Sequence, residues 1–217
     1  MIDFAAAREA MVDGQVRPSD VTRYPIILAM LETPREDYVP EGLRQVAYLG
    51  DHIPLAPARV TLDARVFAKM LDAAAIGPKD LVLDVGCGLG YSAAVLAHMA
   101  EAVVALEEDE TLAAAAETAL NGHGVDNAAV QKGPLAAGAP AHGPYDAIVV
   151  EGAVERLPAA LTDQLKEGGR IVAIFREGAL GQARLGLKTE SGLAWRRIFD
   201  ATAPVLPGFE AAKAFEF

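Results

Sequence analysis

Three glycines at alternating positions, Gly86, Gly88 and Gly90, join a short apolar run to a helical pattern that begins at Tyr91. Small residues let the backbone approach a ligand closely, and the first N–H groups of a helix are free to bond to it. The run Leu81–Val85 before the glycines is typical of a buried strand. The segment therefore predicts a strand, a ligand-binding turn and a helix, with a tight turn that binds nothing as the alternative.

Two neighbouring residues narrow the class of ligand. Enzymes that bind nicotinamide or flavin dinucleotides share such a turn, but their last glycine position is taken here by Tyr91. Asp84 lies two residues before Gly86, where its carboxylate would repel a pyrophosphate and could hold an ammonium group. The pattern favours a cationic ligand over a dinucleotide.

A second acidic residue points to a ribose. Glu107 ends the apolar run Val103–Leu106 and follows Gly86 by 21 residues, the place where nucleoside-binding α/β folds bind both ribose hydroxyls. Alternatively, it is a solvated acid in the run Glu107–Glu110, which also suits a helix start. An ammonium-binding acid, a ribose-binding acid and a glycine turn together predict S-adenosylmethionine rather than NAD.

Alternating strands and helices position these residues. Buried strands separated by helices form parallel sheets covered on both faces, so the fold class is α/β and doubly wound. Strands are expected at Leu81–Val85, Ala102–Leu106, Tyr145–Val150 and Arg170–Phe175, and helices at Tyr91–Ala100, Glu110–Gly122 and Leu157–Leu165. Other helices are expected at Ala5–Val12, Val21–Leu31 and Ala64–Ala75, loops at Gly50–Asp63 and Pro134–Gly143, and an edge hairpin that includes Ala194–Ala201 before the turn Pro204–Gly208.

Length and composition set further limits. With 217 residues, 52% of them hydrophobic and 23% charged, the chain is expected to form one domain, 1–217, with N-terminal helices and a loop in 1–75 and an α/β core in 76–217. One cysteine, Cys87, excludes a disulfide framework, and four scattered histidines lack metal-ligand spacing. The net charge of −11 argues against a nucleic-acid partner. No signal peptide or apolar run of membrane-spanning length is seen, so a cytoplasmic location is expected.

At this point the chain resembles the class I methyltransferases, in Val82-Leu-Asp-Val-Gly-Cys-Gly-Leu-Gly90, Glu107, Tyr145-Asp-Ala-Ile-Val-Val150 and Leu165-Lys-Glu-Gly-Gly-Arg-Ile-Val172. Among them it is most similar to the protein-L-isoaspartate O-methyltransferase family. Three N-terminal segments carry that likeness: Met11-Val-Asp-Gly-Gln15, Pro34-Arg-Glu-Asp-Tyr-Val-Pro40 and Ala47-Tyr-Leu-Gly-Asp51.

The resemblance implies a seven-stranded, mainly parallel, Rossmann-like sheet with helices on both sides, an N-terminal helical extension and a C-terminal strand hairpin. It implies S-adenosylmethionine as cofactor, and proteins or peptides with altered aspartyl residues as partners; the oligomeric state stays open. The expected cofactor-binding positions are Asp84, Gly86, Cys87, Gly88, Gly90, Tyr91, Glu107, Glu108, Gly133, Pro134, Leu135 and Glu151.

In that family a substrate carboxylate attacks the methyl group, so no general base is needed and rate comes from alignment. The family's acceptor loop, I-G-x-G-Q-T-I-S-x-P, falls here on Leu55–Ala64. Its serine becomes Leu62, with Thr61 one position away, and its glutamine becomes Arg59. These three are the expected acceptor-side positions, with Arg59 able to bind a carboxylate through two prongs. Alternatively, Arg59 is a surface arginine paired with Asp63 or solvent.

Two other departures affect the acceptor and the adenine. Glu151 replaces a threonine after the fourth strand, and it would repel an anionic acceptor by about 1–4 kcal/mol unless Arg156 or Arg176 pairs with it. Pro134 replaces an acid that meets the adenine amine, a contact that backbone carbonyls around Gly133–Leu135 would have to supply.

Three functions follow from these residues. The first is methylation of damaged aspartyl residues in proteins, as the resemblance implies. The second is a methyltransferase of the same frame with another, cationic or neutral, acceptor, which Leu62 and Glu151 favour. The third is a non-catalytic cofactor- or partner-binding module whose acceptor loop has decayed.

Overall fold

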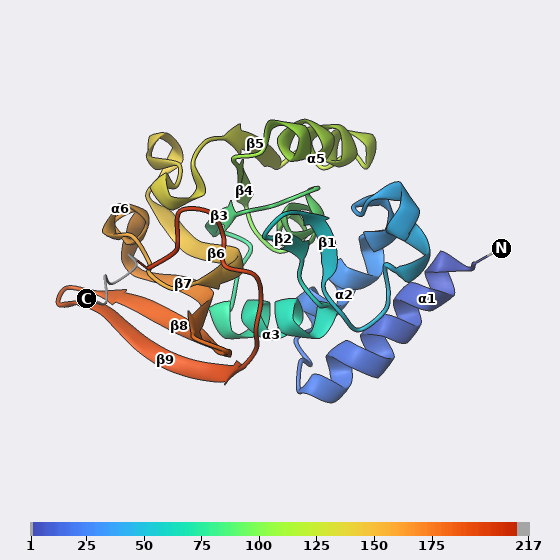
Figure 1. Cartoon of the computed structure of the whole chain (residues 1–217), viewed down its shortest axis with the longest axis horizontal. Coiled ribbons are helices and arrows are strands. Elements are labelled where there is room, and N and C mark those ends of the chain that lie inside the picture. The colour runs from blue at the N-terminus through green and yellow to red at the C-terminus, as the bar shows by residue number, and fades with distance from the viewer. Residues whose placement is uncertain (1, 212–217) are drawn as a thin grey trace, which may run out of the picture.

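A twisted seven-stranded sheet forms the centre of the protein in this computed structural model, which describes residues 2–211 (Figure 1). The strand order is β5-β4-β3-β6-β7-β8-β9. The bounds are β3 Leu81–Val85, β4 Ala102–Glu107, β5 Ala128–Lys132, β6 Tyr145–Val154, β7 Leu165–Glu177, β8 Leu180–Thr189 and β9 Gly192–Asp200. The expected seven-stranded, mainly parallel sheet is confirmed.

The first five of these strands are parallel, and β8 and β9 form an antiparallel hairpin at one edge. β3 is central, with Asp84 level with Ala105 of β4 and Val149 of β6. Figure 1 shows the N-terminal helices (blue) at one end of the molecule and the β8–β9 hairpin (orange) at the other. The expected C-terminal hairpin is confirmed, although the sequence did not single out β5 or β8.

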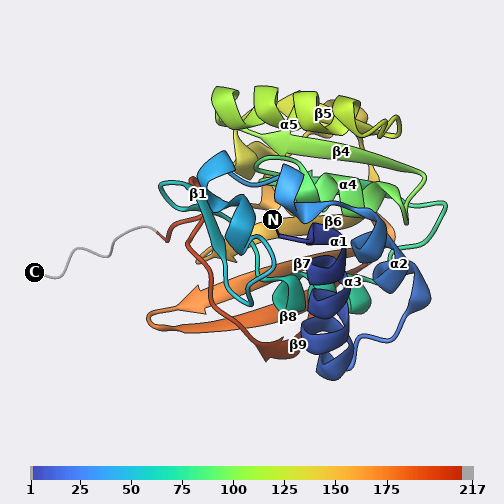
Figure 2. The ribbon, with the colours of Figure 1, turned by 90° about the vertical axis from the view of Figure 1, so that its right-hand side faces the viewer.

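Helices cover the first face of the sheet. Their bounds are α1 Phe4–Met11, α2 Tyr24–Glu32, α3 Ala64–Ala74, α4 Tyr91–Ala97 and α5 Glu110–Gly122. α3 and α4 pack directly on the strands, α1 and α2 lie outside them, and α5 lies along β4 and β5 (Figure 2). Alternate strand residues such as Val82 and Val149 face this side and share its apolar core.

The second face is covered differently from the expectation. The helix expected over Leu157–Leu165 is one turn, α6 Ala159–Thr162, because β7 already begins at Leu165. Two 3₁₀ turns, Leu135–Ala137 and Pro140–His142, share this face with α6. Leu83, Ile148 and Val150 form its core with Leu206 and Phe209 from the end of the described chain.

The residues 201–209 form what we call the C-terminal strap. Ala153 of β6 donates its N–H to the Pro204 carbonyl and accepts one from Leu206, both at 2.9 Å. A Cβ placed on Gly152 would lie 2.6 Å from the Leu206 side chain, so the strap needs a glycine beneath it. The strap (red in Figure 1) therefore closes over the end of β6.

A small hairpin interrupts the segment expected to be a loop. β1 Ile53–Ala56 and β2 Arg59–Thr61 form a separate two-stranded sheet, in which Ile53 pairs with Thr61 and Ala56 with Arg59. Its turn holds Ala58 at φ 58°, the left-handed region. β2 lies against β6, so the hairpin reaches the carboxyl end of the main sheet.

No helix among residues 2–211 is both long enough and apolar enough to cross a membrane.

Candidate functional site

Three acidic side chains meet at the carboxyl ends of adjacent strands. Asp84 lies in β3, Glu107 ends β4 and Glu151 lies in β6, and all three are buried. Of the strands of the main sheet, β3 comes first along the chain and lies between β4 and β6, so the strand order reverses direction here. Ligands of open α/β sheets bind at such a topological switch point. The structure thus brings Asp84, Glu107 and Glu151 together at one crevice, which stays the predicted site of the cofactor.

The glycine turn has the conformation that glycine permits. Gly86, Gly88 and Gly90 have φ values of 86°, 58° and 95°, and Gly90 caps the N-terminus of α4. A Cβ on Gly86 would lie 3.1 Å from Arg59 Nη2, and a Cβ on Gly88 would lie 2.5 Å from Leu55 Cδ1. Two side chains of the β1–β2 hairpin therefore rest on the glycine turn, where the backbone is most approachable.

Glu107 forms a two-pronged ion pair with Arg59. Arg59 Nη1 donates to Glu107 Oε1 at 2.5 Å and Nη2 to Oε2 at 2.6 Å, and the two side chains are 4% and 0% exposed. The same carboxylate accepts N–H groups from Gly88, Glu108 and Asp109 at 2.9–3.0 Å. Both alternatives stated above, a solvated Glu107 and a surface Arg59 paired with Asp63, are wrong.

Asp84 is buried with one oxygen satisfied. Its Oδ2 accepts from the Ser92 hydroxyl at 2.7 Å, whereas Oδ1 has no partner among the described residues. Burial, reinforced by the negative charge of Glu107, raises the pKa of Asp84 to about 7. An inward-facing carboxyl oxygen without a partner is suited to accept from a ligand ammonium.

Glu151 does not form the ion pairs expected of it. Within residues 2–211 its Oε1 has no partner, and Arg176 instead donates to the Gly178 carbonyl at 3.0 Å. Burial, together with the nearby Asp84, raises the pKa of Glu151 well above its usual value. A raised pKa favours the uncharged form of this carboxyl group, which weakens the expected repulsion of an anionic acceptor.

The acceptor-side positions separate in the structure. Arg59 faces the glycine turn, and Thr61 ends β2 half-buried. Leu62, at the family's serine position, is 1% exposed and packs in the core of the first face, so its expected place on the acceptor side is wrong. Its carbonyl accepts from Arg35 Nη2 at 2.7 Å, which pins the hairpin's end to the N-terminal region.

Other expected cofactor positions lie beside the turn or behind it. Leu135 is buried and its N–H donates to Glu108 Oε2 at 3.3 Å, and the Gly133 N–H donates to the Glu107 carbonyl at 3.1 Å, so Gly133–Leu135 lies beside the end of β4. Cys87 is buried within the turn, and its backbone N–H donates to the Leu106 carbonyl at 3.2 Å. Tyr91 points away into the N-terminal core, where the Arg35 guanidinium lies 4.6 Å from its ring centre. Tyr91 therefore supports α4 rather than the crevice.

Sequence reasoning missed four side chains of this region: Arg35, Leu55, Ser92 and His52. Arg35 lies inside the quoted segment Pro34–Pro40, and Ser92 follows the glycine turn by two residues, so both had a local signal. Leu55 is the first residue of the quoted acceptor loop, but its contact with Gly88 joins residues distant in sequence, and nothing in the local pattern of His52 indicated its role.

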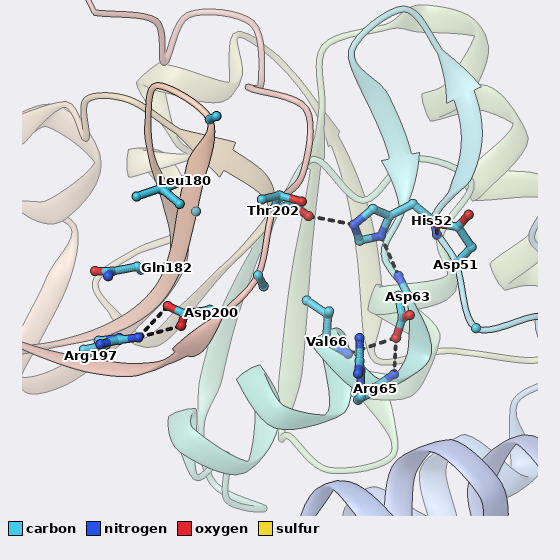
Figure 3. Close-up of a pocket in the computed structure, with 14 residues that line it drawn as sticks. Asp51, His52, Asp63, Arg65, Val66, Leu180, Gln182, Arg197, Asp200 and Thr202 are labelled. Carbon is cyan, nitrogen blue, oxygen red and sulfur yellow. Dashed lines mark hydrogen bonds and ion pairs between the residues drawn. The ribbon is translucent and has the colours of Figure 1, made fainter.

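A cavity of about 670 Å³ with a mixed polar and apolar lining lies beside the β1–β2 hairpin, between the start of α3 and the β8–β9 hairpin (Figure 3). His52 connects the start of α3 to the strap at this cavity: its Nδ1 accepts from the Asp63 N–H at 2.8 Å, and its Nε2 donates to the Thr202 carbonyl at 2.7 Å. Arg65 and Arg197 line it from opposite sides. The cavity adjoins the acceptor loop through Asp63, which caps α3.

The chemical groups of these residues are suited to bind S-adenosylmethionine. Asp84 offers a free oxygen, Glu107 a carboxylate at the ribose position, and the glycine turn a backbone without side chains. The fit requires Arg59 and Leu55 to leave the turn, since both side chains lie where a ligand would contact it.

Comparisons with known proteins show the family of this chain. A family model described as protein-L-isoaspartate(D-aspartate) O-methyltransferase matches residues 7–191. The protein-L-isoaspartate O-methyltransferase of Synechococcus sp. is 36% identical over 88% of this chain and 81% of its own length, and one from Rhodopseudomonas palustris is 38% identical over 78% and 69%.

Two solved structures share the fold. A protein-L-isoaspartate O-methyltransferase aligns with a TM-score of 0.81 and 23% identity, covering 93% of this chain and 66% of that one. A Plasmodium falciparum protein assigned to the same enzymes, crystallised with S-adenosyl-L-homocysteine, aligns with a TM-score of 0.78 and 18% identity over 95% and 99% of the two chains. At these identities the likeness establishes the architecture.

Proposed function

The chain belongs to the protein-L-isoaspartate(D-aspartate) O-methyltransferase family, and we propose that it uses S-adenosylmethionine to methylate the carboxylate of damaged aspartyl residues in proteins or peptides. The observation that carries this proposal is the crevice at the ends of β3, β4 and β6, where Asp84 and Glu107 flank a left-handed glycine turn.

Each residue has a distinct task in the proposed reaction. The free oxygen of Asp84 holds the ammonium group of the donor, and Glu107, once free of Arg59, accepts the ribose hydroxyls. The bound donor supplies a methyl group: its C–S bond breaks as a carboxylate oxygen forms the O–C bond, giving a methyl ester and a neutral thioether. Because the attacking oxygen is already an anion, no residue has to take a proton.

The chain's contribution to rate is alignment and exclusion of water. The C-terminal strap covers Gly152 and Gly86 with Leu206 and so closes one side of the crevice. Such a closed site places the reactants in line and removes competing water, which is where methyl transfer without a general base gains its rate.

The experiment uses a peptide with one isoaspartyl residue, the matched aspartyl peptide and methyl-labelled S-adenosylmethionine. We expect base-labile label in the isoaspartyl peptide only, and its loss in Glu107→Ala. Exposed Glu190→Ala is the matched control and retains transfer. Absence of label in the isoaspartyl peptide with the unmodified protein refutes the proposed acceptor.

A second acceptor class is favoured by one observation. The hydroxyl that the family's acceptor loop places at this position is replaced by Leu62, whose side chain is in the core. An acceptor that is neutral or cationic would not need that hydroxyl. Label transferred to such acceptors from a chemically varied panel, with none to the isoaspartyl peptide, supports this alternative.

We also propose a cytoplasmic location. The one cysteine, Cys87, is buried and free, and a reducing compartment preserves such a thiol.

A further inference from the structure

Arg59 and the expected ribose compete for the same carboxylate. Five donors already bond to Glu107: two N–H groups of Arg59 and three backbone N–H groups. A carboxylate has about four lone-pair sites, so no capacity remains for two hydroxyls. Arg59 must therefore leave Glu107 before a ribose can bond to it.

A released Arg59 needs a new anion. Its guanidinium is 4% exposed, and its Nε has no partner among the described residues. A buried arginine stripped of its carboxylate is strongly unfavourable. The neighbouring Asp84 cannot replace Glu107 as partner, because in the proposed function it holds the donor ammonium.

The reaction itself brings such an anion to this place. Arg59 is part of the acceptor loop, and its two parallel N–H groups match the geometry of a carboxylate. We propose that Arg59 is the acceptor-binding residue, held by Glu107 in the free protein and transferred to the acceptor carboxylate when the nucleoside takes Glu107. This inference rests on the proposed function, and it makes cofactor and acceptor bind with positive coupling.

The hairpin is built to allow the transfer. β1 and β2 form a sheet of their own, so moving their tip breaks no hydrogen bond of the main sheet. The two ends of the hairpin are fixed, by His52 bonded to Asp63 and Thr202 and by Arg35 bonded to the Leu62 carbonyl. Motion is thereby confined to the segment that carries Leu55 and Arg59.

Calorimetry of S-adenosylhomocysteine binding tests the proposal without turnover. In the unmodified protein, an isoaspartyl peptide is expected to tighten this binding about 5- to 20-fold, whereas the same peptide with its carboxylates amidated leaves it unchanged. In Arg59→Met, binding without peptide becomes about 10-fold tighter and the coupling disappears. Arg59→Lys keeps the positive charge but lacks the two parallel N–H donors, and it is expected to retain part of the coupling.

Controls and outcomes separate the two claims. Arg17→Met removes an exposed arginine paired with Asp13 and is expected to behave like the unmodified protein. Coupling that survives in Arg59→Met, or that the amidated peptide reproduces, overturns the role of Arg59 even if isoaspartyl peptide is methylated. Coupling that depends on Arg59 without any methyl transfer overturns the proposed reaction and supports the role of Arg59 as a carboxylate receptor.

Discussion

Removing one partner of the Arg59–Glu107 pair should destabilise the protein far more than removing both. In Glu107→Gln the amide oxygen can still accept from Glu108, Asp109 and Arg59 Nη1, but the NH₂ group faces the Gly88 N–H and Arg59 Nη2. A buried guanidinium left without its anion costs about 3–5 kcal/mol. Arg59→Met leaves Glu107 with three backbone donors, so we expect a smaller loss of about 2–3 kcal/mol.

The double variant Arg59→Met, Glu107→Gln contains no unpaired buried charge, and we expect it to lose only about 1–2 kcal/mol. The double-mutant cycle then gives a coupling free energy of about 3–7 kcal/mol. The assay is urea unfolding followed by circular dichroism, in which 4 kcal/mol moves the midpoint by about 1.5–2 M.

The exposed pair Arg17–Asp13 is the matched control cycle, since its side chains are 51% and 71% exposed and such pairs contribute below about 0.5 kcal/mol. Additive losses in the Arg59–Glu107 cycle, or a loss below about 1 kcal/mol for Glu107→Gln, would refute the reasoning that this is a dry, two-pronged ion pair.

Four further predictions concern the crevice and the segment beside it. Because the folded pKa of Asp84 is raised from 3.8 to about 7, the folded protein keeps a proton that the unfolded chain loses, so stability should fall as pH rises from about 4 to about 7, by at most about 4 kcal/mol. Asp84→Asn should remove that part of the slope of unfolding free energy against pH, and an unchanged slope would count against the raised pKa. Leu55→Ala uncovers Gly88 and should tighten S-adenosylhomocysteine binding in calorimetry; weaker binding would mean that Leu55 supports the nucleoside. Glu151→Thr should not lower the free energy of unfolding, because it removes a buried carboxyl oxygen that has no partner among residues 2–211; a clear loss in thermal unfolding would contradict this. Leu62→Ser should cost about 2–4 kcal/mol in thermal unfolding by emptying a core position. A Leu62→Ser protein of full stability would contradict its place in the core.

The local sequence pattern was sufficient to predict strands that are buried and helices that begin with a capping residue. Leu81–Val85 and Glu110–Gly122 were predicted with the bounds that the structure gives them, the latter because Asp109 caps its first N–H groups. The short, partly polar strand β5 and the glycine-containing β8 escaped, since neither has an apolar pattern of its own. The turn Pro134–Gly143 held no strand, as expected, although it contains two 3₁₀ turns.

The sequence predicted which strand ends carry the candidate site, but not which side chains contact each other there. Asp84, the glycines and Glu107 stand at fixed places in βαβ units, so their meeting follows from the topology. Arg59, the partner of Glu107, lies 48 residues earlier in a hairpin that is not part of the βαβ units. An alignment without gaps gives the position of Arg59 in the loop but not where its side chain points. The same holds for Leu62, whose number matched an acceptor residue while its side chain turned into the core.

Because the strap comes last among the described elements, the crevice is completed late during synthesis of the chain. Leu206 touches Gly152 and approaches Gly86, residues that emerge from the ribosome long before it does. A nascent chain that has completed β3 to β7 therefore has its glycine turn open on one side until the last part of the sequence arrives. A protein cut after Asp200 would keep every strand and yet lack this cover, so the integrity of its C-terminal end decides whether the crevice is sealed.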